Sequence, residues 1–537
     1  MIKHLYLMLC GALVFHLQAE ITSPKITLIF VIDQCPYRYT VQLQQYLKAG
    51  LARFKNEGLV FTNAHHPNAM PATCTGHTDL NTGAYADTHG IVGNAWYTRG
   101  KKMACDDDTP ERAPVLNPLG GFYDEGKSPQ HILTDGISDQ FALASTPEHP
   151  QATYSFGIKS RAAIATSNKC GTPFWIDTRT GMFTTSGAYL QKLPEWLMAF
   201  NTQHKITEPF VWKPKYQNAD AYPHDTQNYK YRGGQPLINS TTPIDATSVH
   251  PYDMMLLTPA ANQLVLDACV ACMDNFFKEH ADGSLLIWAC LGSLDKIGHA
   301  YGSWSKEVWD MLYWLDDQID GCIRHAEKLV GATNVLSILT SDHGVPPIPE
   351  EAQAKGLSNS IRLDAKKLIE ELNSCIEDEF GISHAVHDIK NSALYLSNTM
   401  RKMSHTLKQK LCKRIQKQLH CSPYIVHAWL PDEIATQHGP VTTIPYRIKR
   451  QFFSGRSGDI IIETRPYVLL TMKHTGVGHN APYTYNTHVP LSLMWPEHLQ
   501  HKMIDTKVTT TQLAPTLAKI LKVPQPAGAE DSVLPEM

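Results

Sequence analysis

The sequence predicts an α/β fold built on a mostly parallel sheet that is covered on both faces. Four short apolar runs carry this prediction, because continuous apolar runs are typical of strands that are buried on both sides. Segments with helical spacing of apolar residues lie between the runs, and such alternation indicates this fold class. The runs are 26–32, 285–290, 335–339 and 467–472, and helical spacing occurs at 43–54, 262–280, 305–329, 363–379, 400–419 and 509–521.

Asp and His residues follow each of the four runs. They are Asp33 after the first run, Asp295 and His299 after the second, Asp342 and His343 after the third, and His479 after the fourth. Ligands of open parallel sheets bind beyond the carboxyl ends of the strands, so these side chains are expected to converge. Carboxylate oxygens together with imidazole nitrogens suit zinc. The pattern therefore predicts a metal-centred active site, with Asp295 and His299 on one helix face.

The bulk composition describes an ordinary globular protein of considerable size. A length of 537 residues allows about two to four domains. The 48 basic and 51 acidic side chains leave a net charge of −3. A protein whose main role is nucleic-acid binding normally carries a basic footprint, and this chain has none.

The N-terminus has the pattern of a secretory signal peptide, expected at residues 1–19. Lys3 supplies the positive start, residues 5–15 form a short apolar segment, and Ala19 offers a small residue for cleavage. No later run of about 18 apolar residues predicts a membrane span. We therefore expect a periplasmic or secreted protein, in a compartment that permits disulfides.

Twelve cysteines do not by themselves define a disulfide framework. Removal of Cys10 with the signal leaves eleven, an odd number, so at least one thiol stays unpaired within the chain. Cys269 and Cys272 lie in an apolar periodic stretch and are expected to be buried helix positions rather than zinc ligands. The disulfide pairing and the oligomeric state stay open.

The expected organisation is a core made of two separated segments. Residues 20–345 form its first part, with an irregular Gly-, Pro- and Asp-rich insertion at about 96–150. Residues 346–451 carry two amphipathic helical patterns and two short strand patterns, which fit a small α+β cap over the site. Residues 452–537 complete the core.

A nucleophile is expected in the hydroxyl-rich segment 71–78. A hydroxyl at a helix N-terminus can also serve only as a cap. Cys74 as a thiol-phosphatase nucleophile would need an arginine six residues later, where Leu80 stands. A formylglycine sulfatase would need proline and arginine where Gly76 and Thr78 stand, so both cysteine mechanisms are disfavoured.

Several ordered motifs resemble the alkaline phosphatase superfamily, and most closely its periplasmic branch with a threonine nucleophile. This branch is related to type I phosphodiesterases and nucleotide pyrophosphatases. The resemblance runs from Lys25 to Leu534 and implies an alkaline-phosphatase-like three-layer sandwich with a mostly parallel central sheet and inserted cap segments. The motifs are Asp33-Gln34, Gly76-His77, Thr82-Gly83, 88–94, 456–459, 485–490 and the four strand-end groups.

The resemblance implies two Zn²⁺ ions. One would be bound by Asp295, His299 and His479, and the other by Asp33, Asp342, His343 and the nucleophile. The nucleophile of this branch stands three residues before the Gly-His pair, which is Thr73 here, with Thr75 as the competitor. Cys74 and Thr75 stand where the relatives more often carry small and proline residues. His77 and His89 belong to the motif frame and are expected to be structural.

Lys159 and Arg161 bear on the substrate class. Residues two apart in the strand-like stretch 154–164 project from one face. Two adjacent cations suit the dianion of a phosphate monoester. The resemblance implies that this pair, together with the amide of Asn94, contacts the phosphoryl oxygens, as in the monoesterase branch.

The sequence thus predicts an exported zinc-dependent phosphatase that hydrolyses small phosphate monoesters through a phosphothreonine intermediate. The first alternative is a phosphodiesterase or nucleotide pyrophosphatase on the same fold. The second is a catalytically inactive binding protein, and the third is manganese-dependent phosphoglycerate mutase chemistry. The physiological ester stays open.

Overall fold

The structure is a computed structural model that describes residues 23–223 and 229–537. The predicted signal peptide lies outside these residues. Among them, no helix is long and apolar enough to cross a membrane.

A nine-stranded sheet forms the centre of the core. Its strand order is β11-β10-β9-β14-β1-β15-β23-β2-β24. Strand β1 lies in the middle and pairs in parallel with β14 and β15, while β9 and β10 extend the parallel part. The bounds are β1 Ile26–Ile32, β2 Leu59–Phe61, β9 Gln151–Gly157, β10 Thr172–Asp177, β11 Met182–Thr184, β14 Ser284–Leu291, β15 Val335–Thr340, β23 Leu491–Met494 and β24 Lys502–Ile504.

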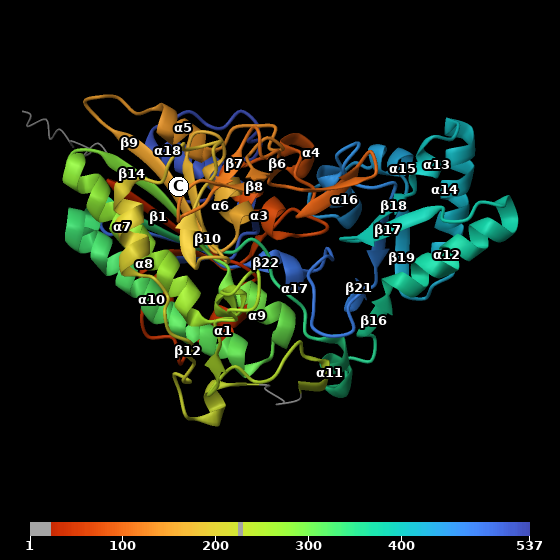
Figure 1. Cartoon of the computed structure of the whole chain (residues 1–537), viewed down its shortest axis with the longest axis horizontal. Coiled ribbons are helices and arrows are strands. Elements are labelled where there is room, and N and C mark those ends of the chain that lie inside the picture. The colour runs from red at the N-terminus through yellow and green to blue at the C-terminus, as the bar shows by residue number, and fades with distance from the viewer. Residues whose placement is uncertain (1–22, 224–228) are drawn as a thin grey trace, which may run out of the picture.

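Both faces of this sheet are buried, as the apolar runs predict. Leu28 and Phe30 of β1 pack into one apolar cluster, while Ile29 and Val31 pack into another on the opposite face. This alternation is the two-residue period of a strand. In Figure 1 helices α7 Glu195–Gln203, α8 Pro259–Glu279 and α10 Lys306–Val330 cover one face, and α5 Ile137–Leu143 and α18 Leu513–Leu521 the other. The three-layer α/β fold is confirmed.

Only the second half of the expected helix at 43–54 is helical, because residues 43–49 form turns and irregular structure between two shorter helices. Helix α1 spans Tyr37–Gln42 and α2 spans Gly50–Glu57. The carboxylate of Asp316, on α10, accepts the backbone N–H groups of Lys48, Ala49 and Leu51, so it supplies the N-terminal cap of α2. This long-range cap therefore fixes the start of α2 at residue 50, later than local periodicity predicted.

The fourth apolar run is not a strand of the central sheet, contrary to the sequence prediction. Strand β21, Val468–Thr471, pairs only with β16, Ile361–Asp364, in a separate two-stranded sheet. Most of its residues are half-buried, whereas all residues of β1 are buried. Leu469 and Leu470 are only partly buried and pack against two different apolar clusters.

The insertion at 96–150 contains short regular elements. A hairpin of β4, Ala95–Thr98, and β5, Lys101–Ala104, is followed by a three-stranded sheet and then by α5. That sheet contains β6 Asp107–Asp108, β7 Pro114–Leu116 and β8 Phe122–Lys127.

A second body, here called the accessory lobe (residues 361–471), extends to the right of the core in Figure 1. Its four-stranded sheet has the order β17-β18-β20-β19 and its own apolar cluster. Strand β20, Ile460–Thr464, completes this sheet, so the lobe extends past the expected boundary at 451. The other elements include α12 Ala365–Phe380, β17 Val386–Lys390, β18 Ala393–Leu396, α14 His405–Leu419, β19 Ile425–Trp429 and α16 Ile444–Gln451.

Helix α16 fastens the accessory lobe to the core through two buried side chains. Arg447 donates to the carbonyls of Pro67 and Pro482 at 3.0 and 2.8 Å. Burial lowers the pKa of Arg447 to about 10. The amide of Gln451 accepts from the N–H of Met70 at 2.7 Å and donates to its carbonyl at 2.8 Å. The lobe thus binds the loop that precedes residue 73.

Candidate metal centre

The predicted strand-end residues meet at one edge of the central sheet. Because β14, β1 and β15 are neighbours, Asp33 and Asp342 leave the sheet side by side, and Asp295 follows on α9, Ser293–Tyr301. His299 lies four residues further on the same helix, as predicted. His479 reaches the site from the loop after β21, so it converges although its strand belongs elsewhere.

Two groups of these side chains are close enough to hold a metal ion. Asp33, Asp342 and His343 form one group, and Asp295, His343 and His479 form the other, with ligating atoms within 4.8 Å of one another in each. His343 belongs to both groups, and its ring stacks on that of His479 at 3.6 Å. Nε2 of His299 lies 3.2 Å from Oδ1 of Asp295, at the border of the second group.

Backbone carbonyls orient all three imidazoles in the same way. Nδ1 of His299 bonds to the carbonyl of Val477 at 2.7 Å, and Nδ1 of His479 bonds to that of Pro71 at 2.8 Å. Nδ1 of His343 lies 3.1 Å from its neighbour's carbonyl. A proton on Nδ1 leaves the Nε2 lone pair for a metal, the arrangement that metal-binding histidines commonly have.

Several buried ligand atoms of the centre lack hydrogen-bond partners among the described residues, which is typical of a cation-binding site. Oδ1 of Asp33, Oδ2 of Asp342 and Nε2 of His343 are buried, and none has a hydrogen-bond partner among the described residues. Buried polar groups normally have partners, and a divalent cation would satisfy all three at once. The donor set therefore fits a metal that prefers nitrogen and oxygen ligands.

The pKa shifts of these residues also favour a cation-binding site. Burial raises the pKa of Asp33 well above its ordinary value, and the carboxylates of Asp295 and Asp342 raise it further. Burial lowers the pKa of His479 well below its ordinary value, and neighbouring imidazoles add to this effect. The centre thus combines crowded carboxylates with a neutral imidazole, and metal binding requires neutral imidazoles.

Gln34 connects the two groups, a role that the sequence did not reveal. Its backbone N–H donates to Oδ1 of Asp342 at 3.0 Å, and Nε2 of its side chain donates to Oδ1 of Asp295 at 2.7 Å. The residue has a φ of 66°, which is rare for a residue other than glycine. Its position directly after Asp33 was the only available signal.

Thr73 is the first residue of helix α3, Thr73–Thr82, which packs against the centre. Nδ1 of His77 lies 2.8 Å from the carbonyl of Thr73 and 3.4 Å from Oδ2 of Asp342. A Cβ on Gly76 would lie 2.3 Å from the carbonyl oxygen of Asp342, so only glycine permits this contact. Thr75 is buried in the same helix, and its hydroxyl has no hydrogen-bond partner among the described residues.

Asn94 is held against the start of α3. Its Oδ1 accepts the backbone N–H of Cys74 at 2.8 Å. The amide is thereby oriented with its Nδ2 donor group directed away from Cys74. Thr73 and Asn94 are therefore neighbours, although 20 residues separate them in the chain.

Lys159 and Arg161 do not lie on a strand, contrary to the prediction for 154–164. Strand β9 ends at Gly157, and helix α6, Ser160–Ser167, begins after Lys159. The parallel strand must turn into its covering helix here, so the two-residue period of a strand no longer applies. A common role for Lys159 and Arg161 therefore has to be argued from their charges and contacts, because strand periodicity does not place them on one face.

Lys159 lies among the carboxylates of the centre. Its Nζ donates to Oδ2 of Asp33 at 2.5 Å and also to Oδ2 of Asp295. Arg161 lies within electrostatic range of Lys159, and its buried Nε has no hydrogen-bond partner among the described residues. An unpaired buried guanidinium N–H is suited to bind an anion.

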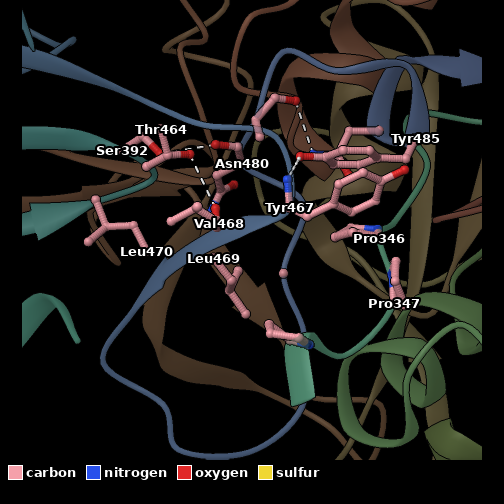
Figure 2. Close-up of a pocket in the computed structure, with 14 residues that line it drawn as sticks. Pro346, Pro347, Ser392, Thr464, Tyr467, Val468, Leu469, Leu470, Asn480 and Tyr485 are labelled. Carbon is pink, nitrogen blue, oxygen red and sulfur yellow. Dashed lines mark hydrogen bonds between the residues drawn. The ribbon is translucent and has the colours of Figure 1, made fainter. Parts of the chain in front are cut away.

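A small pocket lies where the loop of His479 meets the accessory lobe (Figure 2). The hydroxyl of Tyr485 accepts the N–H of Tyr467, and the two rings lie 4.7 Å apart. On the opposite side, Ser392 donates to the carbonyl of Asn480 at 3.0 Å. These contacts hold the backbone on the C-terminal side of His479.

Comparison with known proteins identifies the family of this chain. The family described as type I phosphodiesterase / nucleotide pyrophosphatase matches residues 27–489. The chain belongs to this family. The resemblance drawn from the sequence motifs is thereby confirmed.

Named relatives span nearly the whole chain. Alkaline phosphatase PafA of Elizabethkingia meningoseptica is 26% identical, covering 96% of this chain and 95% of that protein. Alkaline phosphatase PhoV of Synechococcus elongatus is also 26% identical, with 96% and 93% covered. The crystal structure of PafA superposes with a TM-score of 0.84 at 24% identity, over 96% and 99% of the two chains, which shows the shared fold.

The contact of Gly76 with Asp342 gives a first prediction. Gly76→Ala is expected to displace α3 from the metal centre, with a loss of about 1–3 kcal/mol from overpacking and weaker metal binding. Gly321→Ala is the matched control, because a Cβ there meets nothing within 4 Å on helix α10. That change is expected to preserve or raise stability. Thermal unfolding and calorimetric zinc titration measure both effects; equal behaviour of the two variants would contradict the contact.

Proposed function

We propose that the protein is an exported zinc-dependent phosphatase that hydrolyses small phosphate monoesters through a phosphothreonine intermediate. The observation that carries the proposal is that helix α3, which begins at Thr73, packs against Asp342 beside the two metal-ligand groups. Phosphoryl transfer needs a hydroxyl nucleophile, a cation site and an anion-binding donor. Nε of Arg161, which has no hydrogen-bond partner among the described residues, is such a donor. Family membership and the named phosphatase relatives support the same reaction.

Two zinc ions would be held by the residues already described. Asp33, Asp342, His343 and Thr73 would bind one ion, and Asp295, His299 and His479 would bind the other. Zinc in such sites lowers the pKa of bound hydroxyl groups and stabilises oxygens that gain charge.

The protein residues have separate tasks. The hydroxyl of Thr73 attacks phosphorus in line with the departing ester oxygen, and water later attacks the phosphothreonine. The amide of Asn94 donates to one equatorial oxygen, and Lys159 and Arg161 bind the others. Charge on these oxygens dominates a loose phosphoryl-transfer transition state, so preorganised donors stabilise it.

Charge favours a monoester over a diester. A monoester dianion carries one more negative charge than a diester, and the cations of Lys159 and Arg161 match this charge. The phosphodiesterase or nucleotide pyrophosphatase reading is the second candidate, and the description of the matching family favours it.

Export is supported by a disulfide. Cys74 and Cys105 are joined, and structural disulfides persist in oxidising compartments. This agrees with the signal-like sequence at residues 1–19.

The first experiment compares p-nitrophenyl phosphate with bis-p-nitrophenyl phosphate, using zinc-loaded and chelator-stripped protein. We expect zinc-dependent hydrolysis with a kcat/KM for the monoester that exceeds that for the diester. Faster diester cleavage would assign the protein to the second candidate function. Equal activity after complete metal removal would overturn the metal mechanism.

Thr73 and Thr75 provide a matched pair of isosteric changes. Thr73→Val removes the nucleophile and is expected to lower kcat at least about 10³-fold, the scale on which loss of a catalytic group is usually measured. Thr75→Val removes a hydroxyl that has no hydrogen-bond partner in the described part of the chain, and it is expected to leave kcat within a few-fold of wild type. Acid-quenched labelling with a ³²P-monoester, read by mass spectrometry, locates the phosphothreonine. A label on residue 75 would reverse the assignment.

The basic pair sets the specificity in this proposal. Lys159→Ala with Arg161→Ala is expected to lower kcat/KM for the monoester by about 10²-fold or more, on the scale of lost transition-state donors. The loss for the diester should be much smaller, because one phosphoryl oxygen is esterified. Equal losses for both substrates would remove the pair from the specificity argument. Lys169→Ala, at an exposed lysine, serves as the charge control.

A further inference from the structure

A disulfide joins the residue next to the proposed nucleophile to the insertion. Cys74 directly follows Thr73, and Cys105 directly follows strand β5. The bond closes a loop with a sequence separation of 31 residues, and Asn94 lies inside that loop. The loop closed by the disulfide therefore contains Asn94, a proposed phosphoryl-binding residue, and begins next to Thr73, the proposed nucleophile.

Both half-cystines also bind Asn94 through their backbones. The N–H of Cys74 donates to Oδ1 of Asn94 at 2.8 Å. The N–H of Cys105 donates to the backbone carbonyl of Asn94 at 3.1 Å. One half-cystine thus orients the side chain of Asn94, and the other fixes its backbone.

The surroundings make the bond a local constraint rather than the only support of the fold. Cys74 and Cys105 are each 2% exposed and pack in an apolar cluster with Trp96 and Ile91. Gln451 also donates to the carbonyl of Val92, which joins the Asn94 segment to the loop before Thr73. Without the disulfide, these contacts keep the segments together while Asn94 gains freedom.

We propose that the Cys74–Cys105 disulfide is a positioning element that holds the amide of Asn94 against Thr73, and that its reduction lowers phosphoryl transfer. The proposal rests on the proposed function. A displacement of about 1 Å in a positioned group can cost about 10²-fold in rate. The link therefore makes turnover dependent on an oxidised state of the protein.

The main test compares Cys105→Ala with Cys170→Ala, a change at an exposed free cysteine. For Cys105→Ala we expect kcat/KM for p-nitrophenyl phosphate to fall at least about tenfold and inhibition by inorganic phosphate to weaken, as loss of a positioned donor predicts. Zinc content should stay at the wild-type level. A wild-type kcat/KM and phosphate inhibition in Cys105→Ala would overturn the proposal.

A double-mutant cycle separates positioning from general destabilisation. In an Asn94→Ala background, Cys105→Ala should cost at most about twofold, because the group that the disulfide positions is already gone. The same loss with and without Asn94 would show a merely structural role and refute the inference.

Reduction of the unmutated protein gives a second measure if the variant does not fold. Tris(2-carboxyethyl)phosphine supplies two electrons that break the S–S bond. Water supplies the oxygen of the resulting phosphine oxide and the two protons that convert the sulfurs into thiols. Alkylation and mass spectrometry measure thiol formation at positions 74 and 105. Activity and phosphate binding should fall as these thiols form. Both should return on reoxidation. Full retention in the doubly reduced protein would overturn the proposal.

Failure of the proposed function is distinguishable from failure of this inference. A wild-type protein that does not turn over the monoester would refute the phosphatase hypothesis. Calorimetric titration with inorganic phosphate would still test the disulfide, since weaker binding is expected in Cys105→Ala and unchanged binding would contradict it.

Discussion

Crowded negative charge at the ends of three neighbouring strands is the constraint on which the rest of the site depends. Asp33, Asp295 and Asp342 are all buried; burial raises the pKa of Asp33, and repulsion from the other two carboxylates raises it further. Every neighbouring feature limits this repulsion: Gln34 donates to two of the carboxylates, and Lys159 places an ammonium group between two of them. A site with this excess of negative charge is suited to bind cations.

The central sheet positions the carboxylates, while other residues of the site come from the segments that connect its strands. Parallel strands bring the carboxylates together, but Thr73, the proposed nucleophile, and His479 lie on connections between the strands of the sheet. Helix α16 of the accessory lobe binds one of these connections through Arg447 and Gln451. Carbonyl contacts to the imidazoles then link the second connection to the first, because Nδ1 of His479 bonds to the carbonyl of Pro71.

Sequence reasoning predicted the convergence of the Asp and His residues better than it predicted the elements that carry them. Local patterns predicted the buried strands and the shared helix face of Asp295 and His299, since both follow from short-range periodicity. The strand at 467–472 was assigned to the wrong sheet, and Lys159 and Arg161 were placed on a strand that ends before them. Sheet membership, the cap from Asp316, the role of Gln34 and the disulfide depend on contacts between distant segments, which one sequence does not display.

The attachment of α16 also limits how the molecule can be simplified. Deleting the accessory lobe would leave the backbone groups of Met70 without their amide partner and would expose carbonyls that Arg447 now covers. A minimal version of the protein cannot therefore be made by trimming at the lobe's sequence boundaries. The exposed turn after α12 is the better place for a fused reporter or an affinity tag, because none of the contacts of Arg447 and Gln451 described above involves it.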